Sequence, residues 1–363
     1  MPVTGHGKMK ILIIAEAPGE QEDQQGIQLI GPAGQVLRGA LAEFGIDLDN
    51  DCRKTNAVRC RPPANRKPSR MEIVSCQSHI WEEIKKNPPK VIILLGQVAV
   101  ESFFSGRSSK SPGAIGRWRG FIIPDQKAGA WVCPTFHPSY ILRSREGRRI
   151  RGKEDPDMAV EERIFIADIE KALTHLHKPF LVAPVPKIFI DGPVHVQKAS
   201  FISIDYETTG LRPWQKKEHR IVSFGICWRD GVLSRPMEGN NIDDLKRILS
   251  DPSIKKVGHN IKFEQTWATH CLGVETQGWV WDTMLAAHMV DNRRRICKLK
   301  HQIYLNFGVE DWTGKNSFGE DDDEDDSDGL VNQGPPSPEL LRYNALDAFW
   351  TYQLATKQME LFK

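Results

Sequence analysis

Two acidic residues past the middle of the chain are spaced for metal chemistry. The segment FISIDYETTGL reads as an apolar strand that ends in Asp205 and Glu207. Alternate residues of a strand point to the same side, so these carboxylates are expected to project together. Close carboxylates repel each other and raise each other's pKa, and a divalent cation relieves that repulsion. A strand that simply ends in two solvated acids is the plainer interpretation, so further ligands must argue against it.

Two later segments provide such ligands. VGHNIKFEQTW places Asn260 and Glu264 one helical turn apart on one face. LLRYNALDAFWTYQL gives Tyr343 and Asp347 the same spacing inside an amphipathic helix. Burial of that helix explains its leucine and phenylalanine positions but not Asp347. These residue types predict a carboxylate cage for divalent cations.

The three motifs, in this order and spacing, resemble the proofreading 3′–5′ exonuclease domain of family A DNA polymerases with a tyrosine in the third motif. The resemblance spans about residues 196–363. It implies two Mg²⁺ or Mn²⁺ ions about 4 Å apart, one activating water and the other stabilising the leaving 3′-oxygen. Asp205, Glu207 and Asp347 would hold these ions, and the substrate would be a single-stranded 3′ end of DNA.

The same resemblance assigns the remaining residues of this site. Tyr343 would orient the attacking water, because a phenol with a pKa of about 10 is a poor base at neutral pH. Asn260 would contact the strand or fix the site geometry. Glu264 stands where the family usually has aspartate, so we expect it to be an outer or water-mediated metal ligand and the activity to survive.

Four loops in the first half indicate a second site. AEAPGEQED, TNAVRCRPPANR, GQVAVESFF and TFHPSYILR each follow a predicted strand, and the carboxyl edge of a parallel sheet is where α/β folds bind ligands. These loops carry Glu16, Asn56 and His137 beside cations and turn-forming residues. Taken singly, Asn56 could cap a turn and His137 could be an ordinary loop histidine. Together the loops predict a pocket for a phosphate and a base.

These loops resemble family 4 uracil-DNA glycosylases, and the wider uracil-DNA glycosylase superfamily, over about residues 8–150. The resemblance implies that Glu16 orients or activates the water that attacks the deoxyribose C1′ atom. Asn56 would read the edge of a flipped uracil, and His137 would stabilise the departing uracil anion. Leu29 stands where the family stacks an aromatic ring on uracil, a change worth about one or two orders of magnitude in base capture.

Two interpretations of this first domain therefore stay open: an active uracil-DNA glycosylase, or a module that binds DNA or an unusual base without chemistry.

The cysteines of this domain bear on whether it holds an iron–sulfur cluster. Cys60 and Cys76 match the later pair of ligands of the family's 4Fe-4S cluster, and the chain does not supply the first pair. Cys52 and Cys133 would replace them only if the fold brings them close. We expect small buried hydrophobic cysteines and an incomplete iron–sulfur remnant.

The elements that must position these residues form two α/β domains. The strands predicted near 11–15, 53–58, 91–95 and 131–135 indicate a mostly parallel sheet. The resemblance to uracil-DNA glycosylases implies that helices cover both faces of this sheet, in a three-layer α/β/α fold. The second domain is expected to have a ribonuclease H-like exonuclease fold. Its predicted strands lie near 201–206, 221–228 and 231–237, and its predicted helices near 242–250, 261–271, 282–306 and 338–359. The glycosylase-like domain is predicted to span residues 1–178, and a proline-containing linker is predicted at 179–197. The exonuclease domain is predicted to span residues 198–363, with a mobile acidic loop at 314–337.

Charge is strongly segregated along the chain. The net charge is +2, and the eight acids of residues 320–328 mask a charge of +10 on the rest. Cations cluster at 53–70, 143–153 and 293–300, the pattern of a phosphate-backbone binder. Arg61 and Arg66 are the candidate phosphate contacts in the first cluster. For the third cluster, on a predicted helix, a solvated surface explains the charge equally well.

Composition narrows the class of protein. No run approaches eighteen apolar residues and no signal peptide precedes the first strand, so a membrane or secreted protein is disfavoured. Seven unpatterned cysteines favour a reducing cytoplasm. The resemblance to family A polymerases implies that this cytoplasm is bacterial and that the gene belongs to a bacterium or its phage. We expect the N-terminal part or the separate editing component of a family A DNA polymerase, with a polymerase domain or another replisome protein as partner. A purely structural assembly subunit is the remaining alternative, and the complete carboxylate set argues against it.

Overall fold

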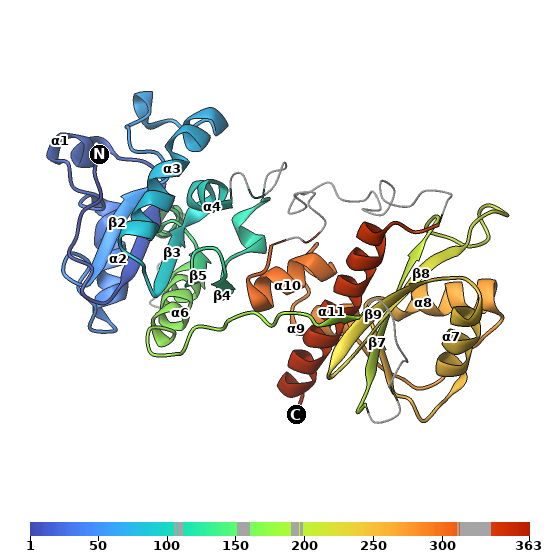
Figure 1. Ribbon diagram of the computed structural model, residues 1–363. Helices are drawn as coiled ribbons and strands as arrows, with labels where there is room; N and C mark the ends of the chain where they lie inside the picture. The colour runs from blue at the N-terminus through green and yellow to red at the C-terminus, as the bar shows by residue number, and fades with distance from the viewer. Residues whose placement is uncertain are drawn as a thin grey trace. The chain divides into compact units, whose positions relative to one another are not determined.

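The structure, a computed structural model, describes residues 1–104, 107, 112–150, 160–189, 196, 199–310, 312 and 335–363. The chain forms two compact units (Figure 1). The first comprises Met1–Ala183 and the segment Tyr304–Glu310, and the second comprises Pro184–Ile303 and the C-terminal part through Lys363. The predicted acidic loop lies outside the described residues from 314 to 334.

The first unit is built on a five-stranded sheet in the order β2-β1-β3-β5-β4. All its neighbouring strands run parallel except β4, which pairs antiparallel with β5 at the edge. Its strands are β1 (Ile11–Ala15), β2 (Cys52–Asn56), β3 (Val91–Leu95), β4 (Ile123–Asp125) and β5 (Ala130–Thr135). Its helices are α1 (Glu20–Gln25), α2 (Pro32–Ala42), α3 (Arg70–Lys86), α4 (Gly96–Phe104), α5 (Pro138–Ile150) and α6 (Val160–Thr174).

Helices cover both faces of this sheet, which gives the expected α/β/α layers (Figure 1). Along β1, Ile11 and Ile13 pack toward α2, α5 and α6, whereas Leu12 and Ile14 pack toward α3 and α4. A strand buried on both faces needs apolar side chains at every position. This is why ILIIA and VIILL are uninterrupted apolar runs.

A short segment from far along the chain completes the core of the first unit. Tyr304 is fully buried there, and its hydroxyl donates to Asp125 at the end of β4. Arg107, also buried, pairs with Asp125 and lies 3.3 Å from the Tyr304 oxygen. The backbone N–H of Gln126 donates to the carbonyl of Gly308. The segment Tyr304–Glu310 therefore belongs to the first unit by packing, although the sequence places it within the second domain.

The second unit contains a six-stranded sheet in the order β11-β10-β7-β8-β9-β6. The central strands β7, β8 and β9 form an antiparallel meander. Its strands are β6 (Ile188–Phe189), β7 (Ile202–Thr208), β8 (Ile221–Trp228), β9 (Gly231–Pro236), β10 (Lys256–Gly258) and β11 (Trp279–Asp282). Its helices are α7 (Asn240–Ser250), α8 (Ile261–Trp267), α9 (Thr283–Val290), α10 (Leu299–Phe307, whose last turn belongs to the first unit) and α11 (Pro338–Leu361).

Alternation along β7 decides which side chains meet which helix. Ile202 and Ile204 join the core that includes α7 and Trp267 of α8. Ser203 faces the other way, and its hydroxyl donates to the carbonyl of Ala348 in α11. Figure 1 shows α11 along one face of the sheet and α7 and α8 on the other. The odd-numbered residues of β7 therefore point toward α11.

The predicted single helix over 282–306 is wrong. The structure has α9 and α10, separated by residues 291–298. Asp291 accepts hydrogen bonds from the backbone and guanidinium of Arg293, and Arg295 has a positive φ of 63°, so the backbone leaves the helical path there. Most of the basic cluster at 293–300 consequently lies between helices rather than on one.

Several short elements escaped the sequence pattern. β4, β10 and β11 have three or four residues each, too few for periodicity to register. β6 falls inside the segment predicted as linker and pairs with β9. None of the described helices combines the length and apolar character that a bilayer span requires.

Candidate active sites

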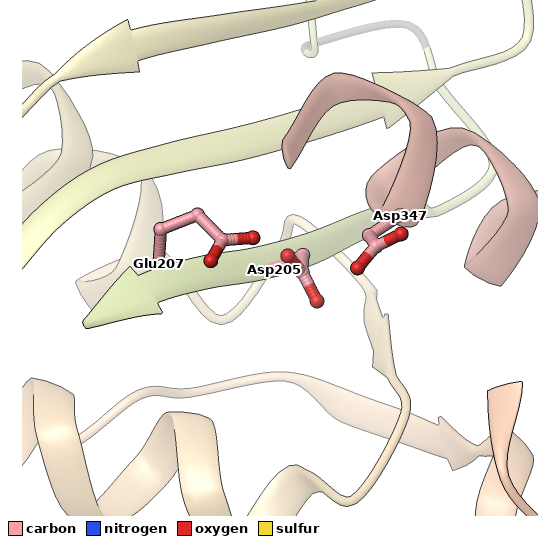
Figure 2. Close-up of side chains that lie close together, drawn as sticks. All are labelled: Asp205, Glu207 and Asp347. Carbon is pink, nitrogen blue, oxygen red and sulfur yellow. The ribbon is translucent and has the colours of Figure 1, made fainter. Parts of the chain in front are cut away.

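Three carboxylates meet between β7 and α11 in the second unit. Asp205 and Glu207 both point from β7 toward α11, which carries Asp347 (Figure 2). One carboxylate oxygen from each residue lies within 4.8 Å of the others, and Figure 2 shows Asp205 between the other two. Among the described residues this is the group of acids, histidines and cysteines close enough to hold a metal ion. Hard oxygen ligands of this kind suit Mg²⁺ or Mn²⁺.

Electrostatics also favour a cation at this carboxylate cluster. Burial raises the pKa of Asp205 well above its usual value, and the charge of Asp347 raises it further. A hydrogen bond from Asn344 and the charge of Lys300 act in the opposite direction. Three carboxylates in so small a volume therefore carry their full charge only when a cation compensates it. The residues present fit a divalent metal site.

Tyr343 lies one helical turn before Asp347 and is 8% exposed. Burial raises its pKa well above 10, and the nearby charges of Asp347, Glu207 and Asp205 add to that effect. The phenol therefore keeps its proton. The ammonium of Lys300 lies 5.3 Å from the centre of the Tyr343 ring. A protonated phenol suits the orientation of a water molecule rather than proton abstraction.

Glu264 and Asn260 lie beside this cluster rather than within it. Both line a 400 Å³ cavity together with Asp205. Burial raises the pKa of Glu264, and Asp205 contributes. Within the part of the chain that the structure describes, its buried Oε2 atom has no hydrogen-bond partner. Asn260 caps α8 in a left-handed conformation with φ of 71°, and its backbone N–H donates to Asp282.

Sequence reasoning missed three residues around this site. Trp312 donates from Nε1 to Asp347 Oδ1 at 2.5 Å, and no sequence pattern marks it because it lies outside any regular element. Asp282 accepts backbone N–H bonds from the start of α8 and from the start of α9. Asn344 donates to Asp205. A buried asparagine inside an apolar helical segment was the signal that could have identified it.

The first unit gathers its predicted residues at one cavity of 950 Å³. Glu16 follows β1, Asn56 ends β2, and His137 follows β5, so all three lie at the carboxyl edge of the parallel strands. Leu29 also lines this cavity. The parallel topology brings these residues together as the order of the loops predicted.

The orientation of the His137 ring follows from its neighbours. The backbone N–H of Ser139 lies 3.2 Å from His137 Nδ1. A backbone N–H can only donate, so Nδ1 accepts and the neutral ring carries its proton on Nε2. Burial lowers the pKa of His137 to about 4, with a contribution from Arg143. Gly96 allows this packing, because a Cβ atom there would lie 2.8 Å from the His137 Cβ.

Glu16 and Leu29 occupy different environments in the same cavity. Burial raises the pKa of Glu16, while the charges of Lys67 and Arg143 act against it. Leu29 is 6% exposed and has a positive φ of 58°. The backbone at this position is therefore unusual for any side chain with a Cβ atom. Asn56 is also buried.

The predicted phosphate contacts are already paired within the protein. Arg66 donates to both carboxylate oxygens of Glu72, at 2.7 and 2.9 Å. Arg61 donates to Asn65 at 2.7 Å and lies 3.5 Å from Glu20. Exposed pairs of this kind are weak. The acids that pair with the run at 53–70 therefore come from neighbouring parts of the first unit, because the run itself contains none.

Cysteine positions argue against the proposed replacement ligands. Cys52 lies on β2 and Cys133 on β5, and two strands, β1 and β3, separate them in the sheet. Three strand spacings amount to roughly 14 Å, too far for one cluster. Burial raises the pKa of both thiols, to about 12 for Cys52. Cys60 is exposed and Cys76 is half-buried. Cys52 and Cys133 therefore do not fit an iron–sulfur site.

The two folds and their sites define a DNA-processing protein with a glycosylase-like domain and an exonuclease domain. Residues 2–159 match the model of the uracil DNA glycosylase superfamily, and residues 194–361 match the 3′–5′ exonuclease model of DNA polymerase A type. A type-4 uracil-DNA glycosylase of Thermotoga maritima is 36% identical over 178 residues, which cover 48% of this chain and 83% of that protein. The chain belongs to the uracil-DNA glycosylase superfamily through its first domain, and its second domain is a 3′–5′ exonuclease domain.

A further relative spans both domains. The DNA polymerase of Bacillus phage SP01 is 27% identical over 322 residues, which cover 80% of this chain. The chain matches about a third of that polymerase's length, 34%. Among solved structures, Brucella melitensis NrnC with bound Mg²⁺ is similar at 20% identity, with a TM-score of 0.36, over 48% of this chain and 78% of NrnC.

Proposed function

We propose that the second unit removes nucleotides from single-stranded 3′ ends of DNA with the help of two divalent cations, Mg²⁺ or Mn²⁺. The observation that carries this proposal is the cluster of Asp205, Glu207 and Asp347, whose oxygens lie within 4.8 Å of one another. Bound cations supply an activated water and stabilise the leaving 3′-oxygen. The three carboxylates would hold them.

Other side chains of the second unit orient the attacking water and bind the terminal nucleotide. Tyr343 keeps its proton and hydrogen-bonds the attacking water, which aligns that water with the scissile phosphate. Glu264 assists from the wall of the neighbouring cavity as an outer ligand, through its unpartnered oxygen. Asn260 contacts the terminal nucleotide in the same cavity or fixes the geometry there.

A second activity, uracil excision, is favoured for the first unit by the arrangement of three residues at one cavity. Asn56 reads the edge of a flipped base. His137 donates from Nε2 to the oxygen that gains charge as uracil leaves, since its Nδ1 atom is occupied by Ser139. Glu16 orients the water that adds to C1′ as the bond to uracil breaks.

Leu29 supports the alternative that this unit binds DNA or a modified base without excising it. An aliphatic side chain forgoes base stacking worth about 1–3 kcal/mol, so the base would be held less firmly. The chemistry of Glu16, Asn56 and His137 does not depend on that contact. We therefore favour slow excision over binding alone.

At the level of the whole protein, we infer that this chain is the N-terminal part or the editing component of a family A DNA polymerase. Its similarity to the phage SP01 polymerase extends over both domains. An exonuclease beside a uracil-recognising domain would examine newly made DNA and its template for different faults.

One experiment tests both activities. The protein is incubated with a 5′-labelled oligonucleotide that contains one uracil, with Mg²⁺ or with EDTA, and a thymine oligonucleotide serves as control. We expect Mg²⁺-dependent shortening from the 3′ end of both substrates, and alkali-labile sites only at uracil, in EDTA. Absence of shortening contradicts the exonuclease proposal, and absence of alkali-labile sites contradicts excision.

A further inference from the structure

Asn344 connects the carboxylate cluster to the sheet beneath it. It lies on α11 between Tyr343 and Asp347 and is fully buried. Its Nδ2 atom donates to Asp205 Oδ2 at 2.7 Å and lies 3.3 Å from the Asp205 carbonyl oxygen. A single amide thus contacts both the side chain and the backbone of a proposed metal ligand.

The opposite end of this amide is held by two hydroxyl groups. Ser223 Oγ and Ser234 Oγ donate to Asn344 Oδ1 at 3.1 and 3.0 Å. If the amide turned over, its oxygen would face the Asp205 carboxylate and the two would repel each other. The hydroxyls satisfy the oxygen, and the carboxylate requires the NH₂ group. The amide therefore has one favourable orientation, in which it donates to Asp205.

Gly225 makes this contact sterically possible. It lies opposite Asp205 in the pairing of β7 with β8. A Cβ atom at Gly225 would lie 2.6 Å from the Asn344 carbonyl oxygen and 3.0 Å from Ala348 Cβ. Any larger residue would push α11 away from the sheet, so glycine at this position sets the distance between the helix and the ligand-bearing strand.

We propose that Asn344 is a positioning residue that fixes the Asp205 carboxylate for metal binding, with Ser223 and Ser234 holding its amide in the donating orientation. The inference rests on the proposed metal site of the exonuclease unit. A carboxylate anchored through Oδ2 loses rotational freedom, so less entropy is lost when it binds a cation. Asn344 would contact neither substrate nor metal itself.

The test is direct binding of Mn²⁺ to the full-length protein, measured by electron paramagnetic resonance and calorimetry without DNA. We expect Asn344→Ala to weaken Mn²⁺ binding about tenfold, the lower end of the usual effect of losing a residue that orients a metal ligand. Gln358→Ala is the matched control. Gln358 is a buried amide on the same helix, bonded to Trp281 and to the Thr283 carbonyl. Its loss should leave Mn²⁺ affinity within about twofold, because it touches no carboxylate of the cluster.

Further outcomes separate this inference from the proposed function. If the wild-type protein and Asp205→Ala bind Mn²⁺ equally, the metal site itself is wrong. If Asp205→Ala loses binding while Asn344→Ala keeps wild-type affinity, only the positioning role fails. Should Asn344→Ala not fold, the double variant Ser223→Ala, Ser234→Ala keeps the amide but frees its orientation. We expect that variant to bind Mn²⁺ several-fold more weakly, and an unchanged affinity would overturn the proposal.

Discussion

The two candidate sites treat negative charge in opposite ways. In the second unit three carboxylates share one small volume, and burial together with the charge of Asp347 raises the pKa of Asp205. In the first unit the candidate catalytic carboxylate, Glu16, also has a pKa raised by burial, with a smaller contribution from Glu101, but the positive charges of Lys67 and Arg143 act against that rise. At the first site, basic side chains of the protein compensate the negative charge of the carboxylate. At the second site, divalent cations from solution would compensate most of the negative charge of the three carboxylates.

This difference means that a chelator separates the two activities. Removal of divalent cations should abolish exonuclease action and spare uracil excision.

The largest effect is expected from Asp205→Ala. Loss of this ligand removes metal-based stabilisation worth several kcal/mol, so Mg²⁺-dependent shortening should fall at least about a thousandfold. Uracil excision in EDTA should remain unchanged. Rates on a 5′-labelled oligonucleotide provide the measurement. Asp230→Ala, at an exposed turn of the same unit, is the control and should retain both activities.

His137→Ala should produce the reverse pattern. Removing one donor to a developing anion costs about a hundredfold to a thousandfold, so excision in EDTA should fall by that factor. Exonuclease rates should not change. His6→Ala, at an exposed position of the first unit, serves as the matched control. A loss of exonuclease activity in His137→Ala would mean that the two sites are not independent.

Leu29→Phe should strengthen the first site by restoring an aromatic surface for the base. Stacking worth about 1–3 kcal/mol predicts roughly tenfold faster excision at limiting substrate. Both residues carry a Cβ atom and face the same cost of the positive φ at this position, so backbone strain should cancel. Leu29→Met, which is flexible and not aromatic, is the control. Equal rates for the two variants would exclude stacking as the cause.

The smallest effect is expected from pH. Burial lowers the pKa of His137 from 6.5 to about 4, so the ring stays neutral across the physiological range. Protonation of His137 should leave the rate of excision in EDTA unchanged down to about pH 5, and should halve that rate near pH 4. In the unfolded chain this histidine has its ordinary pKa of 6.5 and binds the proton more readily than in the folded protein. The contribution of the neutral ring to the free energy of unfolding is therefore fully present above about pH 6.5 and is lost as the pH falls toward 4. Rates between pH 4 and 8, compared with His137→Asn, isolate the contribution. A midpoint near 6.5 would mean that the ring is not desolvated.

How much of each site could be read from the sequence depends on how local its geometry is. The i, i+2 spacing of Asp205 and Glu207 and the i, i+4 spacing of Tyr343 and Asp347 specify relative side-chain directions within one element. Their convergence requires α11 to lie on the face of β7 that carries the odd-numbered residues. Nothing local to either motif contains that information.

Contacts between distant segments could not be predicted. Asn344 on α11 accepts hydrogen bonds from Ser223 on β8 and Ser234 on β9, more than one hundred residues earlier in the chain. The break between α9 and α10 depends on the Asp291 side chain and on the conformation of Arg295, which hydrophobic periodicity does not report. Apolar runs such as ILIIA identified the core strands because burial on both faces leaves a continuous signal.

The segment Tyr304–Glu310 limits how this gene can be rearranged. Glycosylase and nuclease domains are often regarded as modules that recombination exchanges at a linker. Here an exchange of the first 183 residues would separate Asp125 and Arg107 from Tyr304, an aromatic residue with no exposed surface. A replacement first domain would have to provide a buried pocket for Tyr304 with the same shape and with the same charged groups. We therefore expect the two halves to be inherited together, as one unit of exchange.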